Sequence, residues 1–337
     1  MTGAYRRPDV SPAELKRTLG LALDLGVDVV DTAPWWGESE NICGEALRAL
    51  RAWERVLLTT KVPPPLAAPT ALELLKDDEG LAFRDPLPRV FPPAYVEERV
   101  ERSLRATKLE VLPLVMLTAW HDSWLESTAW PELLGIMEAL RRKGKVLSWG
   151  LCLPGLATTA AERALDQPVF AAIAAPHCLW SLAAERLAAA AAERELAFFA
   201  SLVMGQGGLS GEILATSTFR HDDVRHLRFG APEGLEELSR RVAELCEFTK
   251  SAPPAARSSN GAREILERVQ RREREPECET VAELAVRFAL SAPAVTTAVI
   301  GTSSAAHLQA NAAAAARGPL SAATLEPLRA LIARRAP

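Results

Sequence analysis

The sequence predicts an α/β protein built as a (β/α)8 TIM barrel, on three observations. Short apolar runs typical of buried parallel strands alternate along the chain with helices that have one apolar face. The 337 residues are enough for one large barrel. The composition, 48% hydrophobic and 24% charged, is that of a globular protein with a sizeable core. We therefore treat residues 1–337 as one barrel domain.

The first helix and the first strand are well marked. Ser11 and Glu14 form a capping-box pattern, with a proline between them at the first helical position. Apolar residues then recur on one face until Gly26, a residue typical of a helix end. A buried strand is predicted over Val27–Asp31, and the next helix over Glu40–Leu50.

Six further strands continue the alternation, separated by helices such as 95–107, 132–143 and 281–290. The predicted strands are Arg55–Val62, Val111–Thr118, Val146–Cys152, Val169–Ala175, Leu196–Val203 and Val295–Ile300. An eight-stranded barrel needs one strand more, and its natural place is before Ser11. That short segment contains no convincing strand, so we expect the first strand to be missing or rudimentary.

Two segments interrupt the repeat. Residues 63–93 are rich in proline, and residues 205–279 contain glycine, serine and proline patches and the charged run Arg271–Glu275, typical of a solvated helix end. Both are expected to be long loops over the carboxyl-terminal mouth of the barrel, where such insertions usually lie.

The bulk properties exclude several classes of partner. A net charge of −4 and a pI near 5.9 leave no basic face for nucleic acid or for an anionic membrane. The five cysteines are scattered and lack CxxC spacing, which argues against a disulfide framework or a metal site. No apolar segment is long enough to span a bilayer, and the N-terminus lacks the apolar core of a signal peptide. We expect a cytoplasmic protein, and nothing indicates its oligomeric state.

A specific motif follows the first predicted strand. The segment Asp31–Glu40 reads Asp-Thr-Ala-Pro-Trp-Trp-Gly-Glu-Ser-Glu. It resembles the aldo-keto reductase superfamily, whose second barrel strand ends in Asp-Thr-Ala-x-x-Tyr-Gly-x-Ser-Glu. The resemblance extends over residues 11 to 325 through the segments 44–47, 60–61, 144–150, 206–211, 222–225, 301–311 and 318–320. Trp36 stands where the family has its tyrosine, so the chain looks like a divergent member.

The resemblance implies transfer of a hydride from NADPH to a carbonyl, with the tyrosine supplying the proton. In the family, a lysine paired with an aspartate lowers the pKa of that tyrosine, and a histidine orients the carbonyl. Asp31 and Lys61 match the aspartate and the lysine. Trp36 does not replace the acid, because an indole N–H is not released at neutral pH. Neither Tyr5 nor Tyr95 lies at the end of a predicted strand.

Two residues compete for the family's histidine position. A reading without gaps places Thr118 there, whereas His121 lies three residues further on. His121 therefore either faces the pocket or lies in a surface loop. Lys61 is expected to pair with Asp31 on the neighbouring strand. Without a tyrosine to tune, that pair either has only a structural role or serves a different reaction, in which Lys61 acts as a base or a Schiff-base amine.

The resemblance also implies a site for NADPH or NADH. Glycine-rich turns after two strands fit the phosphate-binding side of the family, where backbone N–H groups and a helix N-terminus favour an anion. Ser303 replaces the arginine that would hold a 2′-phosphate, which weakens a preference for NADPH over NADH. The alternative is that these turns serve only as barrel loops. The cofactor residues implied are Gln206, Gly207, Gly301, Thr302, Ser303, His307 and Asn311.

Tryptophans are predicted to gather at the mouth, because Trp35, Trp36, Trp120 and Trp124 all follow strand ends. They would form an aromatic pocket for a small substrate that is flat or apolar. The alternative is that they pack in the core and at its rim. His177 is a further candidate for the mouth.

The sequence leads to two hypotheses of function. The first is a divergent oxidoreductase of aldo-keto reductase type that uses NAD(P)H to reduce a carbonyl or imine, or runs the reverse reaction, without the tyrosine acid. The second is a redox-silent barrel that acts as a lyase, dehydratase or cyclase, or as a non-catalytic binding protein.

Overall fold

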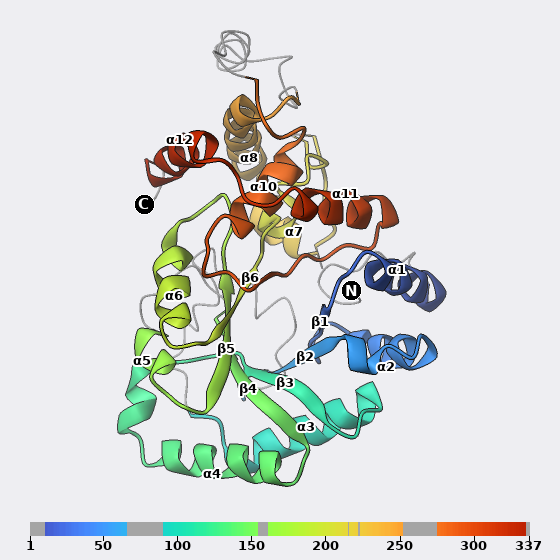
Figure 1. Cartoon of the computed structure of the whole chain (residues 1–337), viewed down its shortest axis with the longest axis vertical. Helices are drawn as coiled ribbons and strands as arrows, with labels where there is room; N and C mark the ends of the chain where they lie inside the picture. Colours follow the sequence, from blue (N-terminus) through green and yellow to red (C-terminus); the bar gives the residue numbers. More distant parts are fainter. Residues whose placement is uncertain are drawn as a thin grey trace.

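The computed structural model describes residues 11–65, 90–153, 161–214, 216–221, 223–251 and 275–334. Its centre is a sheet of seven parallel strands that follow one another in chain order and curl into a nearly closed barrel (Figure 1). The strands are β1 Val29–Asp31, β2 Leu57–Val62, β3 Leu112–Leu117, β4 Val146–Cys152, β5 Phe170–Pro176, β6 Ala197–Ser201 and β7 Thr297–Ala298. The predicted (β/α)8 class and all seven predicted strands are thereby confirmed.

The helices surround this barrel. They are α1 Pro12–Asp24, α2 Ser39–Ala49, α3 Pro93–Thr107, α4 Ala129–Arg142, α5 Glu162–Leu165, α6 Ala183–Ala192, α7 Val224–Phe229, α8 Pro232–Leu245, α10 Val281–Leu290, α11 Ala305–Ala316 and α12 Ala322–Ala333. Short 3₁₀ helices are η1 Trp53–Arg55, η3 Asp122–Glu126, η5 Gly205–Gly207 and η6 Cys246–Phe248. No helix of the described ranges is both long and apolar enough to cross a membrane.

The start of α1 is built as its sequence predicts. Ser11 Oγ accepts from the backbone N–H of Glu14, and the Glu14 side chain accepts from the backbone N–H of Ser11, which completes the capping box. The helix stops before Gly26, whose φ of +84° lies in the left-handed region that glycine tolerates best.

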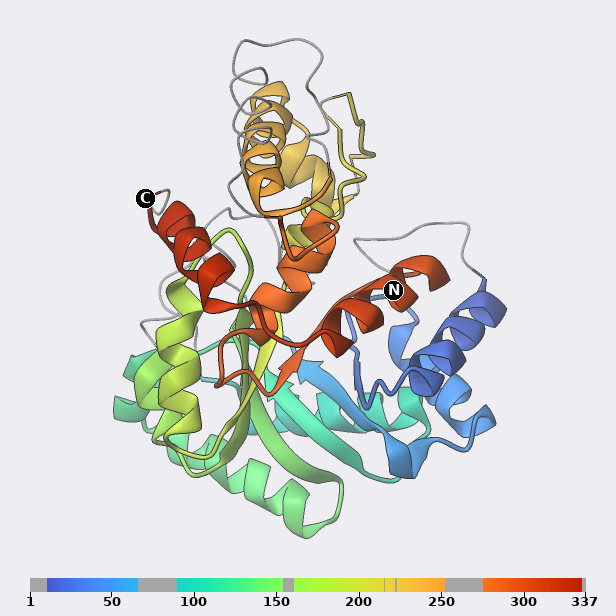
Figure 2. The same ribbon diagram turned by 45° about the horizontal axis from the view of Figure 1, so that its top comes forward.

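The barrel has a seam between its first and last strands. Within the described ranges β1 pairs only with β2, and β7 pairs only with β6. The strand expected before Ser11 would belong at this seam, but it lies outside the described residues. Outside the seam α1 and α11 contact each other, and Figure 2 shows α11 lying alongside the N-terminal helices.

The strands separate two apolar regions, the interior of the barrel and the layer between the strands and the helices. Leu114, Met116, Ala172, Ala174 and Phe199 point inward and fill the barrel. The alternate residues of the same strands point outward and pack on the helices, as the two-residue period of a strand requires.

The expectation that residues 205–279 form only a loop is wrong for part of that range. It contains α7 and α8, and α8 begins at Pro232 and buries Leu235, Leu238 and Leu245. Leucines at this spacing form one apolar face, which is a helix signal.

These two helices cover the loop that follows β6. A methyl group on Gly208 in that loop would lie 2.9 Å from Leu238 of α8 and 3.2 Å from Phe229 of α7. Most of the other segment expected to be a loop, residues 63–93, lies outside the described residues.

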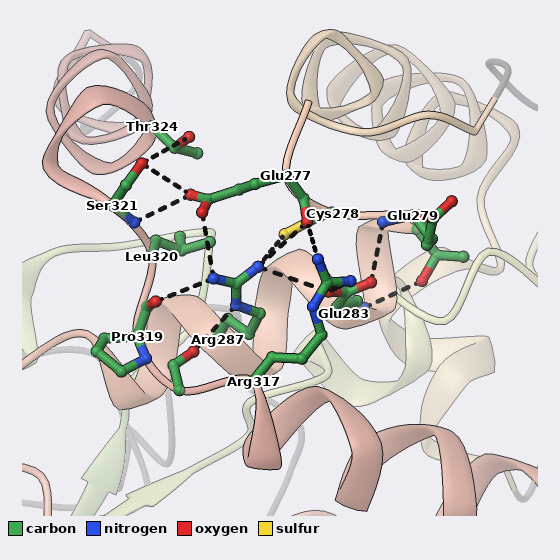
Figure 3. Close-up of polar contacts among 12 residues, drawn as sticks. Glu277, Cys278, Glu279, Glu283, Arg287, Arg317, Pro319, Leu320, Ser321 and Thr324 are labelled. Atoms are coloured by element: carbon green, nitrogen blue, oxygen red, sulfur yellow. Dashed lines mark hydrogen bonds and ion pairs between the residues drawn. The ribbon is translucent and has the colours of Figure 1, made fainter. Parts of the chain in front are cut away.

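A buried arginine joins the last third of the chain (Figure 3). Arg287 of α10 donates to the carbonyl oxygens of Gly318 and Pro319, each at 3.0 Å, and to Glu277 Oε2 at 3.2 Å. Glu277 in turn accepts from the backbone N–H of Ser321, just before α12. The guanidinium therefore fixes the segment before α10 and the turn between α11 and α12 to one helix.

Candidate active site

An ion pair lies at the carboxyl ends of the first two strands. Lys61 Nζ is 2.6 Å from Asp31 Oδ1 and donates to the carbonyl oxygen of Thr32 at 2.9 Å. Both side chains are largely buried, at 5% and 13% exposure. The ion pair that the sequence predicts is therefore present, and it lies on the inner face of the barrel.

Strand register explains how the pair meets. Asp31 of β1 stands opposite Thr59 of β2, and Lys61 lies two residues beyond Thr59 on the same face. Thr59 Oγ1 also donates to Asp31, so the carboxylate is held from two sides. Sequence reasoning missed Thr59, although its place two residues before Lys61 is a signal of a shared face.

Trp36 lies against this pair. The Lys61 ammonium is 4.5 Å from the centroid of the Trp36 ring, a cation–π distance. Trp35 meets Trp36 edge to face, with centroids 6.2 Å apart. An ammonium has three hydrogens. Two of those on Lys61 go to Asp31 and Thr32, and the third has no acceptor in the described part of the chain.

Thr118 and His121 take different places. Thr118 is buried at the end of β3 and donates from Oγ1 to the carbonyl oxygen of Val62 at 2.5 Å. His121 caps the 3₁₀ helix η3, where its Nδ1 accepts from the backbone N–H of Ser123 at 3.1 Å. This contact leaves the proton of a neutral His121 ring on Nε2.

One of the two tyrosines is described. The Tyr95 hydroxyl donates to the carbonyl oxygen of Pro63 at 3.0 Å and also contacts that of Pro64 at 3.3 Å. Its ring packs beside Phe91. Tyr5 lies outside the described residues. Trp36 is thus the aromatic side chain that the described residues bring to Lys61.

The four predicted mouth tryptophans divide into two pairs. Trp35 and Trp36 are partly exposed beside Lys61. Trp120 and Trp124 are buried and pack against Trp130, with centroids 5.4 and 6.5 Å from its ring. Trp120 and Trp124 therefore pack in the core, which was the alternative to a place at the mouth.

The predicted cofactor residues lie in two segments that meet. The loop after β6 carries Gln206 and Gly207, and the segment after β7 leads from Gly301 into α11. His307 Nε2 of α11 is 3.1 Å from Glu212 Oε1, which joins the two segments. Sequence reasoning missed Glu212, because a contact between residues so far apart depends on the path of a loop.

Local contacts shape this junction. Ser304 caps α11 by accepting from the backbone N–H of His307 at 3.3 Å, and Thr302 Oγ1 accepts from the backbone N–H of Ser304 at 3.1 Å. Gln206 has a positive φ of 57°, and its buried side-chain oxygen has no hydrogen-bond partner in the part of the chain that the structure describes. Asn311 lies further along α11, and Ser303 directly precedes the cap.

His177 is buried away from the ion pair. Its ring packs on Phe288 of α10, with centroids 5.1 Å apart, and neither ring nitrogen has a hydrogen-bond partner among the described residues. Burial, with a smaller contribution from the charge of Arg329, lowers the pKa of His177 from 6.5 to about 4. His177 is therefore neutral near pH 7. No group of three or more potential metal ligands occurs in the described ranges.

Comparison with known families agrees with this architecture. The model of the Aldo/keto reductase family matches residues 2–333. The chain belongs to the aldo/keto reductase family. No curated protein matches the sequence significantly.

Solved aldo-keto reductases have the same fold at low sequence identity. The glycerol dehydrogenase AKR11B4 from Gluconobacter oxydans has a TM-score of 0.68 and 21% identity, over 96% of this chain and 87% of that one. An aldo-keto reductase from Klebsiella pneumoniae in complex with NADPH has a TM-score of 0.60 and 20% identity, over 100% and 90%. The enzyme AKR11C1 from Bacillus halodurans has a TM-score of 0.59 and 18% identity, over 96% and 88%.

Proposed function

We propose that this protein is a nicotinamide-dependent oxidoreductase that reduces a carbonyl or an imine, or catalyses the reverse oxidation, without a phenolic acid. The observation that carries the proposal is the Asp31–Lys61 pair beneath Trp36 at the mouth of an aldo/keto reductase barrel. Its five cysteines are free thiols, which fits a reducing compartment such as the cytoplasm.

The place where the loop after β6 meets α11 supports the part of the proposal that a nicotinamide dinucleotide binds. The capped N-terminus of α11 offers backbone N–H groups that favour an anion. In the loop after β6, the buried Gln206 side-chain oxygen has no partner among the described residues and is an acceptor that a bound ligand could satisfy. A related barrel was solved with NADPH. When bound, such a cofactor supplies or accepts the hydride.

The residues around Lys61 would then handle the proton. Lys61 can donate its third ammonium hydrogen in a hydrogen bond to the oxygen of a carbonyl, which stabilises the developing negative charge. The same proton would pass to that oxygen as the alcohol forms, and Lys61 would take up a new proton from solvent. Asp31 balances the charge of Lys61, and the face of Trp36 stabilises it. An iminium substrate needs no such acid.

Cofactor binding is the first test. Titration with NADH and with NADPH is expected to quench tryptophan fluorescence, because Trp35 and Trp36 lie at the mouth. Binding in the micromolar range supports the proposal. If neither nucleotide binds at millimolar concentration, the redox function is excluded, and the second hypothesis, a redox-silent barrel, takes its place.

The second test restores a phenol beside Lys61. In Trp36→Tyr the hydroxyl would lie near the ammonium, and the rate of aldehyde reduction is expected to rise about 10²-fold or more, as for a positioned acid. Trp35→Tyr is the matched control, because the Trp35 ring packs on Trp36 rather than on Lys61. Unchanged aldehyde reduction by Trp36→Tyr with intact cofactor binding would show that the Lys61 site does not act on a carbonyl.

A further inference from the structure

Two histidines meet where the chain enters α7. His221 lies in the turn before the helix and His226 lies within it, and His221 Nδ1 is 2.9 Å from His226 Nε2. The two rings stand nearly perpendicular, at 80°, with centroids 4.4 Å apart. His221 is exposed and His226 is half-buried, so a small ion can reach the pair from solvent.

The chain around the pair holds the two rings together independently of their own contact. Phe219, in the segment before the turn, packs against Phe229 at the end of α7, with centroids 6.4 Å apart. Between these two residues, Asp223 caps the helix by accepting from the backbone N–H of Arg225 at 2.8 Å. The turn and the helix are therefore fixed to each other, which places the two imidazoles in advance of any ligand.

A glycine makes room for the ring of His226. A methyl group on Gly230 would lie 2.7 Å from His226 Nδ1, which is well inside van der Waals contact. The ring therefore lies close to the backbone at the end of α7, with Nε2, its other nitrogen, toward His221. A larger residue at position 230 would have to displace this ring.

The separation of the two nitrogens suits a shared metal ion as well as a hydrogen bond. Neutral imidazole is the commonest metal ligand in proteins. Two imidazole nitrogens that bind one ion at about 2.0–2.1 Å stand about 2.9 Å apart when they lie at right angles around it. In the hydrogen bond one of the two nitrogens carries a proton. If that proton moves to the other nitrogen of the same ring, both lone pairs become available to the ion, and no proton needs to leave the protein.

We propose that His221 and His226 together bind a divalent transition-metal ion that prefers imidazole, such as Ni²⁺, Cu²⁺ or Zn²⁺. Among the described residues no third potential ligand completes a cluster with them, so water fills the remaining positions. The nearby carboxylate of Asp223 is held by Arg225 NH2 at 2.6 Å instead. Mg²⁺ and Ca²⁺ prefer oxygen ligands and are not expected to bind here.

The ion would tie the turn before α7 to the helix itself. Because Phe229 of α7 would lie 3.2 Å from a methyl group on Gly208, this helix covers the loop after β6. The ion would therefore stabilise the cover of that loop. The inference is independent of the proposed function, since neither His221 nor His226 belongs to the residues assigned to the reaction or to the nicotinamide cofactor.

Calorimetric titration of the protein without a histidine tag tests the site, with Ni²⁺ as the probe. The natural protein is expected to bind one ion at its tightest site, and His221→Gln and His226→Gln should each weaken that binding at least about tenfold. The double variant should lose no more than either single variant, because removing one histidine already breaks the chelate. Ni²⁺ should also slow hydrogen exchange of the α7 amides in the natural protein but not in these variants.

His307→Gln is the matched control. His307 is also an imidazole near the surface with a potential ligand beside it, since its Nε2 is 3.1 Å from Glu212 Oε1. Its replacement is expected to leave Ni²⁺ binding unchanged. If His226→Gln disturbs the helix, His221→Gln still decides, because His221 is exposed and lies outside it. The inference is overturned if the variants at 221 and 226 bind Ni²⁺ as tightly as the natural protein, if His307→Gln alone weakens binding, or if saturation with Ni²⁺ leaves exchange of α7 unchanged.

Discussion

At the scale of single residues, His177 shows what burial without a partner does to a titratable group. Its imidazole lies against Phe288, and neither nitrogen makes a hydrogen bond to any residue that the structure describes. Protonation in place would bury an uncompensated charge, which is why burial holds its pKa near 4. The unfolded chain, with an ordinary histidine, binds that proton more readily.

His177 therefore makes the stability depend on pH. Between pH 6.5 and pH 4 the unfolded state binds more protons than the folded state, so the free energy of unfolding falls as the pH falls. The contribution is fully present above pH 6.5, and about 3 kcal/mol of it is lost by pH 4. In urea unfolding, the natural protein should lose about 3 kcal/mol more than His177→Phe between pH 7 and pH 4, because only the natural protein has this histidine. Equal losses in the two proteins would show that His177 titrates normally.

The residues of the candidate site were predictable to different degrees. Asp31 and Lys61 end neighbouring strands, so their meeting follows from the parallel order alone. Whether Trp120 faces the mouth or the core depends on the direction of the chain after β3, which no local pattern fixes. The contact between Glu212 and His307 depends on a loop path and gave no sequence signal.

At the scale of elements, the strands were the easiest to predict. Each is a local apolar run bounded by polar or turn residues, so all seven appear within a few residues of their expected ends. The helices α7 and α8 were missed because glycine, serine and proline patches around them suggested a loop. The leucine spacing inside α8 was the better indicator, since it defines a buried face.

The buried guanidinium of Arg287 is the device that holds α10, the end of α11 and the start of α12 together. Arg287→Met would remove the cation beside Glu277 and take the same donor from the carbonyl oxygens of Gly318 and Pro319. We expect the free energy of unfolding to fall by about 3–5 kcal/mol. Arg240→Met is the control, because Arg240 pairs with Glu237 on the surface and should contribute less than about 1 kcal/mol. Equal losses in chemical denaturation would contradict this role.

At the scale of the whole molecule, strand pairing in the barrel is weakest at the seam between β1 and β7. The central strands pair on both sides over four or five positions, whereas β7 pairs with β6 at two positions. Within the described ranges β1 is bonded on one side only.

Hydrogen exchange should reveal this difference. Amides of β1 and β7 are expected to exchange faster than those of β3 and β4, because strands paired on one side open without unfolding the rest. Peptide-level mass spectrometry of the native protein measures both sets in one experiment. Equal protection in all four strands would mean that another segment covers the seam.

The helices that meet across the seam come from opposite ends of the chain. Because α11 contacts α1, the ring can close only after nearly all of the polypeptide has been synthesised. A nascent chain on the ribosome would expose the edge of β1 and the apolar side of α1 until α11 emerges. Shortening the chain from its C-terminus past α11 is therefore expected to weaken α1 as well, far along the sequence from the cut.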